Sequence, residues 1–209
     1  MNPLIQSVLH YRPTDAWIKQ HSGLAWLALD IDVPYQAISQ EAARVFDQRV
    51  EHRDQDSVLG YSNQGWHSLC LYGESATATS SDQGTMTWTH IASQCPITVD
   101  FVQTHWLTQD CGRIRYMWLA PGGYIMPHQD RKQPELFECN IAIDHPVDSA
   151  VRFLDHGRIP FESGQAFIID TSRRHFAVNQ SESWRLHMIV HADLKPGIVR
   201  RSYEKSFYS

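Results

Sequence analysis

Short runs of apolar and aromatic residues, separated by turn-forming residues, characterise the chain after Gly65. Each run has about the length of a strand and is bounded by Gly, Pro, Asp or Asn, as is typical of strands joined by turns. Seven or eight such runs without an intervening helical period predict a β-sandwich or barrel rather than a parallel α/β sheet. The runs are WHSLCLYG (66–73), ITVDFV (97–102), RIRYMWLAPGG (113–123), FECNIAID (137–144), AVRFLDHG (150–157), GQAFIID (164–170), HFAVNQ (175–180) and WRLHMIVHAD (184–193).

The pattern before Gly65 has a different period. Between residues 34 and 53, good helix formers place apolar side chains at roughly helical spacing, with Ser39 as a candidate cap. We therefore expect a helical N-terminal layer over 1–64, a strand-rich core over 65–195, and a C-terminal tail over 196–209 that packs on the outside. A length of 209 residues is consistent with one domain of this kind.

Composition narrows the class of partner and compartment. Apolar residues make up 42% and charged residues 20% of the chain, as in ordinary globular proteins. The net charge is −5 and the basic residues are scattered, so we expect no nucleic-acid partner. No run reaches membrane-spanning length, the N-terminus lacks signal-peptide features, and the four cysteines form no CxxC pair. These features predict a cytoplasmic protein with reduced thiols and no membrane partner, although four cysteines could also form two disulfides.

The stretch PGGYIMPHQD (121–130) contains the first candidate for chemistry. His128 and Asp130 are two residues apart, a spacing that places both side chains on the same side of a strand. Such a pair often occurs by chance, so a metal site needs a third ligand. His175 precedes a strand-like run 45 residues downstream, and closing a barrel brings remote strands together. Two imidazoles and one carboxylate suit a non-haem Fe(II) site with open positions.

Arg185 lies ten residues after His175, on a run whose alternate positions are Leu186, Met188 and Val190. A buried guanidinium needs an anionic partner. Two interpretations remain open at this point: a carboxylate of the fold, such as Asp170 or Glu138, or the carboxylate of a bound ligand, which a guanidinium can bind bidentately.

From about Gly65 to Asp193 the chain resembles the aspartyl/asparaginyl β-hydroxylases, a branch of the Fe(II)- and 2-oxoglutarate-dependent dioxygenases. The resemblance lies in the order and spacing of GWHSLCLYG, CP (95–96), RIRYMWLAPGGYIMPHQD, NIAI, IPFESGQAFIIDTSRRHFAVNQS and WRLHMIVHADL. It implies a double-stranded β-helix, which is a cupin-like jelly roll, and this agrees with the strand pattern. It also implies Fe(II) and 2-oxoglutarate as cofactors, and O2 as cosubstrate.

The resemblance implies a role for individual residues. His128, Asp130 and His175 would be the catalytic metal ligands, and Arg185 would bind the distal carboxylate of 2-oxoglutarate. Better-studied animal-type members lack the carboxylate ligand, so Asp130 completes the triad here. Asn140 stands where those members have a histidine that helps to bind 2-oxoglutarate, and its amide can still donate to a carboxylate.

The implied reaction is hydroxylation of an amino acid, or of an aspartyl, asparaginyl or similar residue of a peptide or protein, with succinate and CO2 as coproducts. Arg115, Arg131 and His187 are candidate substrate contacts. Two other classes of function remain as alternatives: a non-oxidative cupin-like metal enzyme and a small-molecule-binding jelly roll without catalysis. A cupin-like site does not require a buried arginine, so Arg185 is the discriminating residue.

Overall fold

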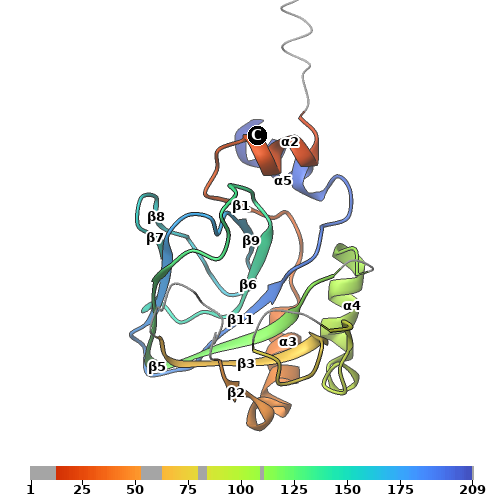
Figure 1. Cartoon of the computed structure of the whole chain (residues 1–209), viewed down its shortest axis with the longest axis vertical. Helices are drawn as coiled ribbons and strands as arrows, with labels where there is room; N and C mark the ends of the chain where they lie inside the picture. Colours follow the sequence, from red (N-terminus) through yellow and green to blue (C-terminus); the bar gives the residue numbers. More distant parts are fainter. Residues whose placement is uncertain (1–12, 53–62, 80–83, 109–110, 209) are drawn as a thin grey trace, which may run out of the picture.

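One long bent strand, β5, connects the two halves of the sheet that makes up most of this protein (Figure 1). The computed structural model describes residues 13–52, 63–79, 84–108 and 111–208. Within these ranges, eleven strands form one curled, antiparallel sheet. The strands are β1 (Trp26–Ala28), β2 (Val50–Glu51), β3 (Asn63–Gly73), β4 (Thr87–Trp88), β5 (Ile114–His128), β6 (Glu138–Asp144), β7 (Ser149–Phe153), β8 (Gly157–Arg158), β9 (Ala166–Ile169), β10 (His175–Asn179) and β11 (Arg185–Val190). The helices are α2 (Asp15–His21), α3 (Tyr35–Arg44), α4 (Pro96–His105) and α5 (Ile198–Tyr208), with short 3-10 turns η1 (Phe46–Gln48) and η2 (Ala92–Gln94).

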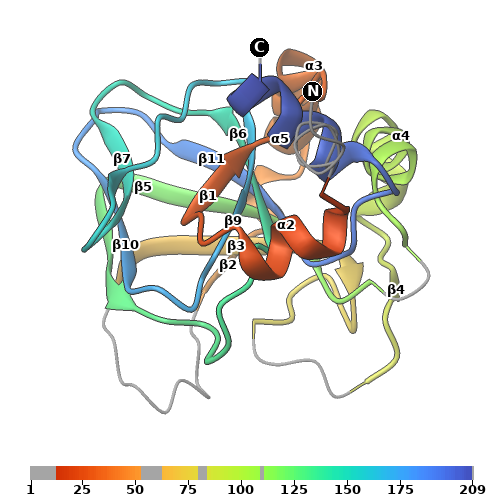
Figure 2. The ribbon, with the colours of Figure 1, turned by 90° about the horizontal axis from the view of Figure 1, so that it is seen from above.

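The strand order makes the sheet fold back on itself. The first part of β5 pairs with β11, which continues through β6 and β9 to β1, whereas its last part pairs with β10, which continues through β7 to β8. Strand β3 runs along the other edge of β5 and pairs with both parts. Figure 2 shows the resulting half-open barrel from above. The predicted jelly-roll fold is therefore confirmed.

The bend in β5 depends on glycine. Gln64 pairs with Tyr124, and Trp66 pairs with Leu119. Between these two pairs, β3 has only Gly65, whereas β5 has residues 120–123, which form the bend. Gly65 has a φ of 69°, and a Cβ atom there would lie 2.8 Å from the Cβ of Ala120. A glycine is needed because this φ and this close approach both disfavour a side chain.

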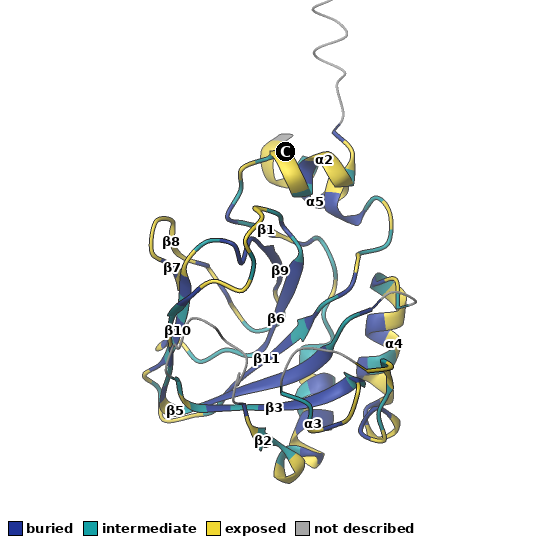
Figure 3. Cartoon of the chain, in the orientation of Figure 1, coloured by how far each residue is buried: buried dark blue, intermediate teal, exposed yellow. Residues whose placement is uncertain are grey.

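Successive side chains of each strand point to opposite faces of the sheet, so the buried apolar residues form two separate clusters. On β11, Leu186, Met188 and Val190 pack toward the helices outside the sheet. The intervening positions, Arg185 and His187, are also buried and therefore project into the barrel. Figure 3 shows that the central strands are buried along most of their length, while the connections around them are a mixture of exposed, intermediate and buried residues. The predicted inward position of Arg185 is a direct result of this alternation.

The prediction of a strand over 97–102 is wrong, because this segment lies in α4. Pro96 occupies the first helical turn, where its missing N–H is not needed. The buried carboxylate of Glu41 then accepts hydrogen bonds from the backbone N–H groups of Ile97 and Thr98, at 2.8 and 2.9 Å. A residue remote in sequence thus caps a helix that the local pattern did not indicate.

The helix predicted over 34–53 is shorter, since α3 ends at Arg44 and β2 follows; Arg53 lies outside the described residues. Ser39 is not a cap: it lies inside α3, and its hydroxyl donates to Asp144 at 2.7 Å.

Both ends of the chain contribute regular elements to the fold. The N-terminal layer contributes β1 to the sheet, where Trp26 pairs with Ile169 of β9. The tail forms α5, which packs against α2, and the carboxylate of Asp15 accepts hydrogen bonds from the N–H groups of Gly197 and Arg200 at 2.6 and 2.7 Å. Among the residues that the structure describes, no helix has both the length and the apolar character needed to cross a bilayer.

Candidate metal centre

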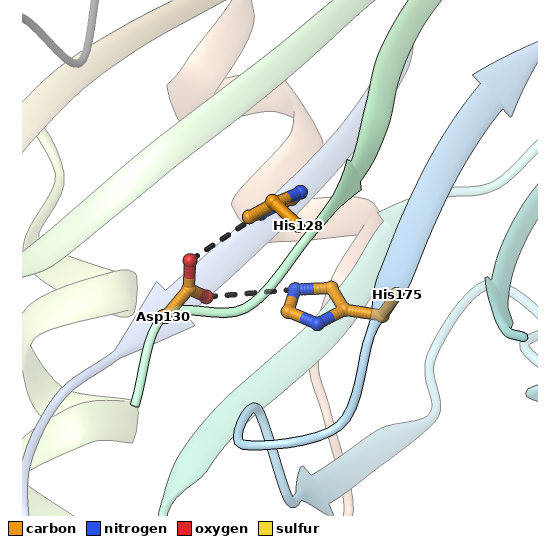
Figure 4. Close-up of side chains that lie close together, drawn as sticks. All are labelled: His128, Asp130 and His175. Carbon is orange, nitrogen blue, oxygen red and sulfur yellow. Dashed lines mark ion pairs between the residues drawn. The ribbon is translucent and has the colours of Figure 1, made fainter. Parts of the chain in front are cut away.

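Three polar side chains meet where β5 ends and β10 begins. His128 closes β5, His175 opens β10, and the two residues are direct partners in the antiparallel ladder. Asp130 follows two residues after His128, and Figure 4 shows its carboxylate next to both imidazoles. Its Oδ1 lies 3.3 Å from Nε2 of His128 and its Oδ2 lies 3.5 Å from Nε2 of His175. One potential ligand atom from each residue lies within 4.8 Å of the others.

The backbone orients both imidazoles in the same way. Nδ1 of His128 donates to the carbonyl of Met126 at 2.8 Å, and Nδ1 of His175 donates to the carbonyl of Arg173 at 2.9 Å. In the neutral form of each ring, this leaves the lone pair on Nε2, the atom that faces Asp130. Fixing the tautomer through the other ring nitrogen is the usual outer-shell arrangement of metal-binding histidines.

Two loops hold the ligand-bearing chain ends together. The backbone N–H of Asp130 donates to the carbonyl of Thr171 at 3.0 Å, and the side-chain amide of Gln129 donates to the carbonyl of Ser172. The carboxylate of Asp170 organises the second loop, because it accepts from the hydroxyl of Ser172 at 2.6 Å and from Nε of Arg173 at 3.1 Å. These contacts fix the segment from which His175 projects.

The ionised carboxylate of Asp130 favours the binding of a cation between the three residues. Burial opposes ionisation of Asp130, but hydrogen bonds from His128 and His175 outweigh it and hold the pKa of this carboxyl far below its usual value. Burial likewise opposes protonation of His175, but Asp130 raises the pKa of this imidazole.

The three residues open into a cavity of about 920 Å³ inside the barrel. This is near the upper end of the range for small-molecule sites, roughly 300–1,000 Å³, and is large enough for more than one small ligand. Of the other residues predicted for the site, the structure brings Arg185, Asn140, Arg115 and Arg131 into the wall of this cavity. His187 is placed differently from the expectation: it is fully buried and does not line the cavity.

Arg185 carries the buried positive charge that the sequence predicted. Its side chain is in a residue only 3% exposed, and its Nε and Nη1 have no hydrogen-bond partner among the described residues. Neither carboxylate considered as a structural partner is paired with it. Asp170 contacts Ser172 and Arg173, and Glu138 lies 3.9 Å from Arg131. Burial lowers the pKa of Arg185 to about 10, so the guanidinium remains charged at neutral pH.

Sequence reasoning missed His52 and Lys132 in the cavity wall. His52 has no ligand-type neighbour in the sequence, yet it lines the cavity, with its Nδ1 2.8 Å from the hydroxyl of Ser68. Lys132, next to the predicted Arg131, also lines it, as do Arg113 and Glu138. Burial raises the pKa of Glu138 to about 6. His52 had no local signal, because it reaches the cavity only through the pairing of β2 with β3.

The donor set fits iron(II). Two imidazole nitrogens and one carboxylate form the facial triad of non-haem iron sites, which leaves further positions for oxygen-containing ligands. A structural zinc site would need four protein ligands. The guanidinium of Arg185, with two nitrogens that lack a partner among the described residues, lies in the same cavity and fits a ligand that carries a carboxylate.

Comparison with known proteins gives a family and a fold. A family model described as aspartyl/asparaginyl beta-hydroxylase matches residues 33–193. No curated protein matches the sequence. An oxidoreductase of the 2OG-Fe(II) oxygenase family from Burkholderia pseudomallei is 10% identical, with a TM-score of 0.52 over 89% of this chain and 92% of that one. The non-heme alpha-ketoglutarate-dependent carbocyclase SnoK from nogalamycin biosynthesis is 11% identical, with a TM-score of 0.51 over 88% of this chain and 87% of that one. Both likenesses support the fold.

Proposed function

Because this chain belongs to the aspartyl/asparaginyl β-hydroxylase family of Fe(II)- and 2-oxoglutarate-dependent dioxygenases, we propose that it hydroxylates an amino acid or an aspartyl or asparaginyl residue of a peptide or protein. In this reaction one oxygen atom of O2 enters a C–H bond of the substrate. The other enters 2-oxoglutarate, which loses CO2 and becomes succinate. Atoms and electrons balance with these two organic reactants and O2 alone.

We assign the metal to His128, Asp130 and His175. When bound, iron(II) supplies the redox chemistry that activates O2, which the side chains of the protein cannot supply. The chain contributes orientation: the carbonyls of Met126 and Arg173 direct both Nε2 atoms toward the carboxylate of Asp130. This arrangement supports a site that is formed before the metal binds, so that little reorganisation accompanies binding.

Arg185 is the proposed anchor of 2-oxoglutarate. Its guanidinium is buried in the wall of the same cavity and has two nitrogens without a partner among the described residues. The distal carboxylate of 2-oxoglutarate would neutralise it through a bidentate contact. Asn140 lies in the same wall and offers an amide donor. The presence of this unpaired cation in one cavity with the metal-type triad is the observation that carries the proposal.

The charge of the cavity favours an anionic substrate. Arg113, Arg115, Arg131 and Lys132 line the cavity in addition to Arg185, whereas Glu138 is the only carboxylate in its described lining besides Asp130. Iron(II), Asp130, 2-oxoglutarate and Arg185 together carry no net charge, and basic side chains outnumber carboxylates among the other described residues of the lining. A substrate with a carboxylate close to the reacting carbon would be attracted to this region. We therefore place acidic amino acids and aspartyl peptides first among the substrates.

We also propose a cytoplasmic location. Cys95 and Cys139 are free, buried thiols in the core, as expected in a reducing compartment.

Anaerobic addition of Fe(II) and 2-oxoglutarate tests the cofactor assignment. We expect a visible charge-transfer absorption that requires both components and that Zn(II) does not produce. Folded protein that binds iron without this absorption would contradict the assignment. Substrate is then sought by measuring succinate release with aspartate, glutamate, asparagine and short Asp- or Asn-containing peptides, with leucine as the neutral control. Mass spectrometry of the product should show the gain of one oxygen atom.

A further inference from the structure

Three polar side chains form a hydrogen-bonded chain that begins in the cavity wall, passes through a fully buried histidine and ends at a half-buried one. Asn140 of β6 lines the cavity, and its Oδ1 lies 2.6 Å from Nδ1 of His187 on β11. Nε2 of His187 in turn lies 2.8 Å from Nδ1 of His145, which follows the end of β6. His187 is 0% exposed, so neither substrate nor solvent contacts it. The proposed reaction assigns no role to either histidine.

Aromatic packing fixes both imidazoles in place. The ring of Phe161 lies 4.8 Å from that of His187, edge-on at 68°, and 5.6 Å from that of His145. Phe161 is itself held by an edge-on contact with Phe167 at 4.8 Å. The backbone N–H of His145 donates to the hydroxyl of Ser163 at 2.9 Å. Two histidines held in this way lose little conformational entropy when they orient a third group.

Both histidines are neutral in the folded protein. Burial lowers the pKa of His145 to about 4, and burial together with the nearby charge of Arg185 lowers the pKa of His187 well below its usual value. A neutral imidazole has one N–H and one lone pair, so the hydrogen bonds of the chain must all run in one direction. If His145 donates from Nδ1 to Nε2 of His187, then His187 must donate from Nδ1 to Asn140.

The direction of these hydrogen bonds decides whether the NH2 group or the carbonyl oxygen of the Asn140 amide faces the cavity. With Oδ1 accepting from His187, the NH2 group remains, and it has no hydrogen-bond partner among the described residues. The amide then presents a donor in the same wall as the unpartnered nitrogens of Arg185. The opposite direction would present a carbonyl oxygen, which repels a carboxylate. Only one direction therefore suits an anionic ligand.

We propose that His145 and His187 are positioning residues that hold the Asn140 amide with its NH2 group directed at the carboxylate of 2-oxoglutarate. This inference rests on the proposed function, since it assumes that 2-oxoglutarate occupies the cavity next to Arg185. It assigns to a buried and a half-buried histidine, neither of which lines the cavity, a share of the affinity for the cosubstrate. An asparagine on its own could present either end of its amide, and the two imidazoles remove that ambiguity.

The protonation pattern is tested directly on the metal-free protein. Nitrogen-15 NMR of histidine-labelled protein distinguishes an imidazole protonated at Nδ1 from one protonated at Nε2. We expect His187 and His145 both to carry the proton on Nδ1, with assignments made from the His187→Leu and His145→Leu spectra. A proton on Nε2 of His187 in the wild-type protein would overturn the proposal, because the amide would then be reversed.

The consequence for binding is tested by anaerobic calorimetry of 2-oxoglutarate with the Fe(II)-loaded protein. His187→Leu should weaken binding about 10- to 100-fold, the usual effect of losing one hydrogen bond to a charged group. His187→Asn, whose Nδ2 can occupy the place of the imidazole Nδ1, should recover most of this affinity. A merely structural role would lower the stability of both variants to urea without this recovery. Unchanged affinity in folded His187→Leu would contradict the proposal.

His145 provides the second variant, which keeps the test decisive if His187→Leu does not fold. His145→Leu should allow His187 to protonate at Nε2, visible by NMR, and should weaken 2-oxoglutarate binding about tenfold. His105→Leu is the matched control, because His105 also donates from Nδ1 to a carbonyl, that of Phe101 at 2.9 Å, but does not line the cavity. If the wild-type protein bound no 2-oxoglutarate, the proposed function itself would fail. Normal wild-type binding with unchanged His187 protonation and affinity in His145→Leu would refute only the positioning role.

Discussion

His128 and His175 are direct partners across the antiparallel ladder of β5 and β10, with ring centroids 4.4 Å apart. Each donates from Nδ1 to the carbonyl of the residue two positions before it. The two histidines are therefore oriented by the same local geometry on opposite strands. Asp130 lies beyond the ladder and contacts both Nε2 atoms. The pairing register of the two strands brings the two candidate histidine ligands together.

Asp130→Ala should weaken Fe(II) binding by more than the roughly 10- to 100-fold that loss of an outer-shell partner costs, because a ligand of the metal itself is removed. Anaerobic calorimetry with Fe(II) measures this. Asp155→Ala is the control, since Asp155 is an exposed carboxylate 2.8 Å from the imidazole of His156 but does not line the cavity. Iron affinity equal in Asp130→Ala and the wild-type protein would rule out the triad.

Arg185→Met should have two opposite effects. Without 2-oxoglutarate the variant should be more stable than the wild-type protein by about 1–4 kcal/mol, because a buried, unpaired charge is replaced by an apolar side chain of similar length. Its affinity for 2-oxoglutarate should fall about 100-fold or more, since a charge-assisted contact worth about 2–5 kcal/mol is lost. Urea unfolding and calorimetry measure the two effects.

Arg185→Lys is the matched variant for this residue. It keeps the charge but not the bidentate geometry, so it should lose affinity without gaining stability. Destabilisation by Arg185→Met in the absence of 2-oxoglutarate would instead indicate a structural partner for the guanidinium.

Glu138 should make the protein less stable as the pH rises from about 4.5 to 6. Burial raises the pKa of this carboxyl from 4.5 to about 6, so the folded state binds more protons than the unfolded state in this window. Below the window both states are protonated, and above it the folded state carries a penalty on the order of 2 kcal/mol. Glu138→Gln should remove this component of the pH profile and be more stable than the wild-type protein at pH 7.5.

Urea unfolding from pH 4 to 8 measures this profile. Glu135→Gln is the control, because Glu135 is the other carboxylate that contacts Arg131, at 3.2 Å. Parallel profiles for Glu138→Gln and the wild-type protein would show that the shift is absent.

Glu41→Gln should destabilise the protein by about 2–3 kcal/mol. The carboxylate of Glu41 is 1% exposed and accepts three hydrogen bonds, from the backbone N–H groups of Ile97 and Thr98 and from the hydroxyl of Thr98. An amide in its place would turn one NH2 toward these donors and remove the favourable charge at the start of α4. Urea unfolding measures the loss. The exposed Asp47→Asn should change stability by less than about 0.5 kcal/mol, and an equal effect of both variants would contradict the capping role.

Gly65→Ala and Gly122→Ala together separate backbone strain from steric contact. Both glycines have a positive φ, 69° and 70°, but only at Gly65 would a Cβ meet another atom, 2.8 Å away on Ala120. We expect Gly122→Ala to cost about 1–2 kcal/mol from the φ value alone. Gly65→Ala should cost at least about 1 kcal/mol more, because Ala120 must move. Equal losses in urea unfolding would show that the bend of β5 tolerates a side chain there.

Local patterns in the sequence were sufficient wherever the physical cause is local. Alternation of apolar residues along 184–193 placed Leu186 and Met188 on one face and Arg185 on the other, since successive side chains of a strand point to opposite sides. This feature requires only the pleat of one strand, so it could be predicted before the fold was known. The proximity of His128 and Asp130 was predicted on the same ground, but Asp130 lies beyond the end of β5, and the hydrogen bond from its backbone N–H to Thr171 holds it in place.

Contacts between remote segments decided the rest. Residues 97–102 form a helix because Glu41, 56 positions away, caps it, and no local period reveals such a contact. His52 reaches the cavity through the pairing of β2 with β3, and His187 turns out to lie behind Asn140 rather than in the cavity. The register of β10 against β5 sets His175 opposite His128, whereas a shift of one residue would turn it to the other face. Residue types and their alternation along single strands could be predicted from the sequence. Which of these residues contact one another depends on the closure of the barrel, because the contacts join remote segments.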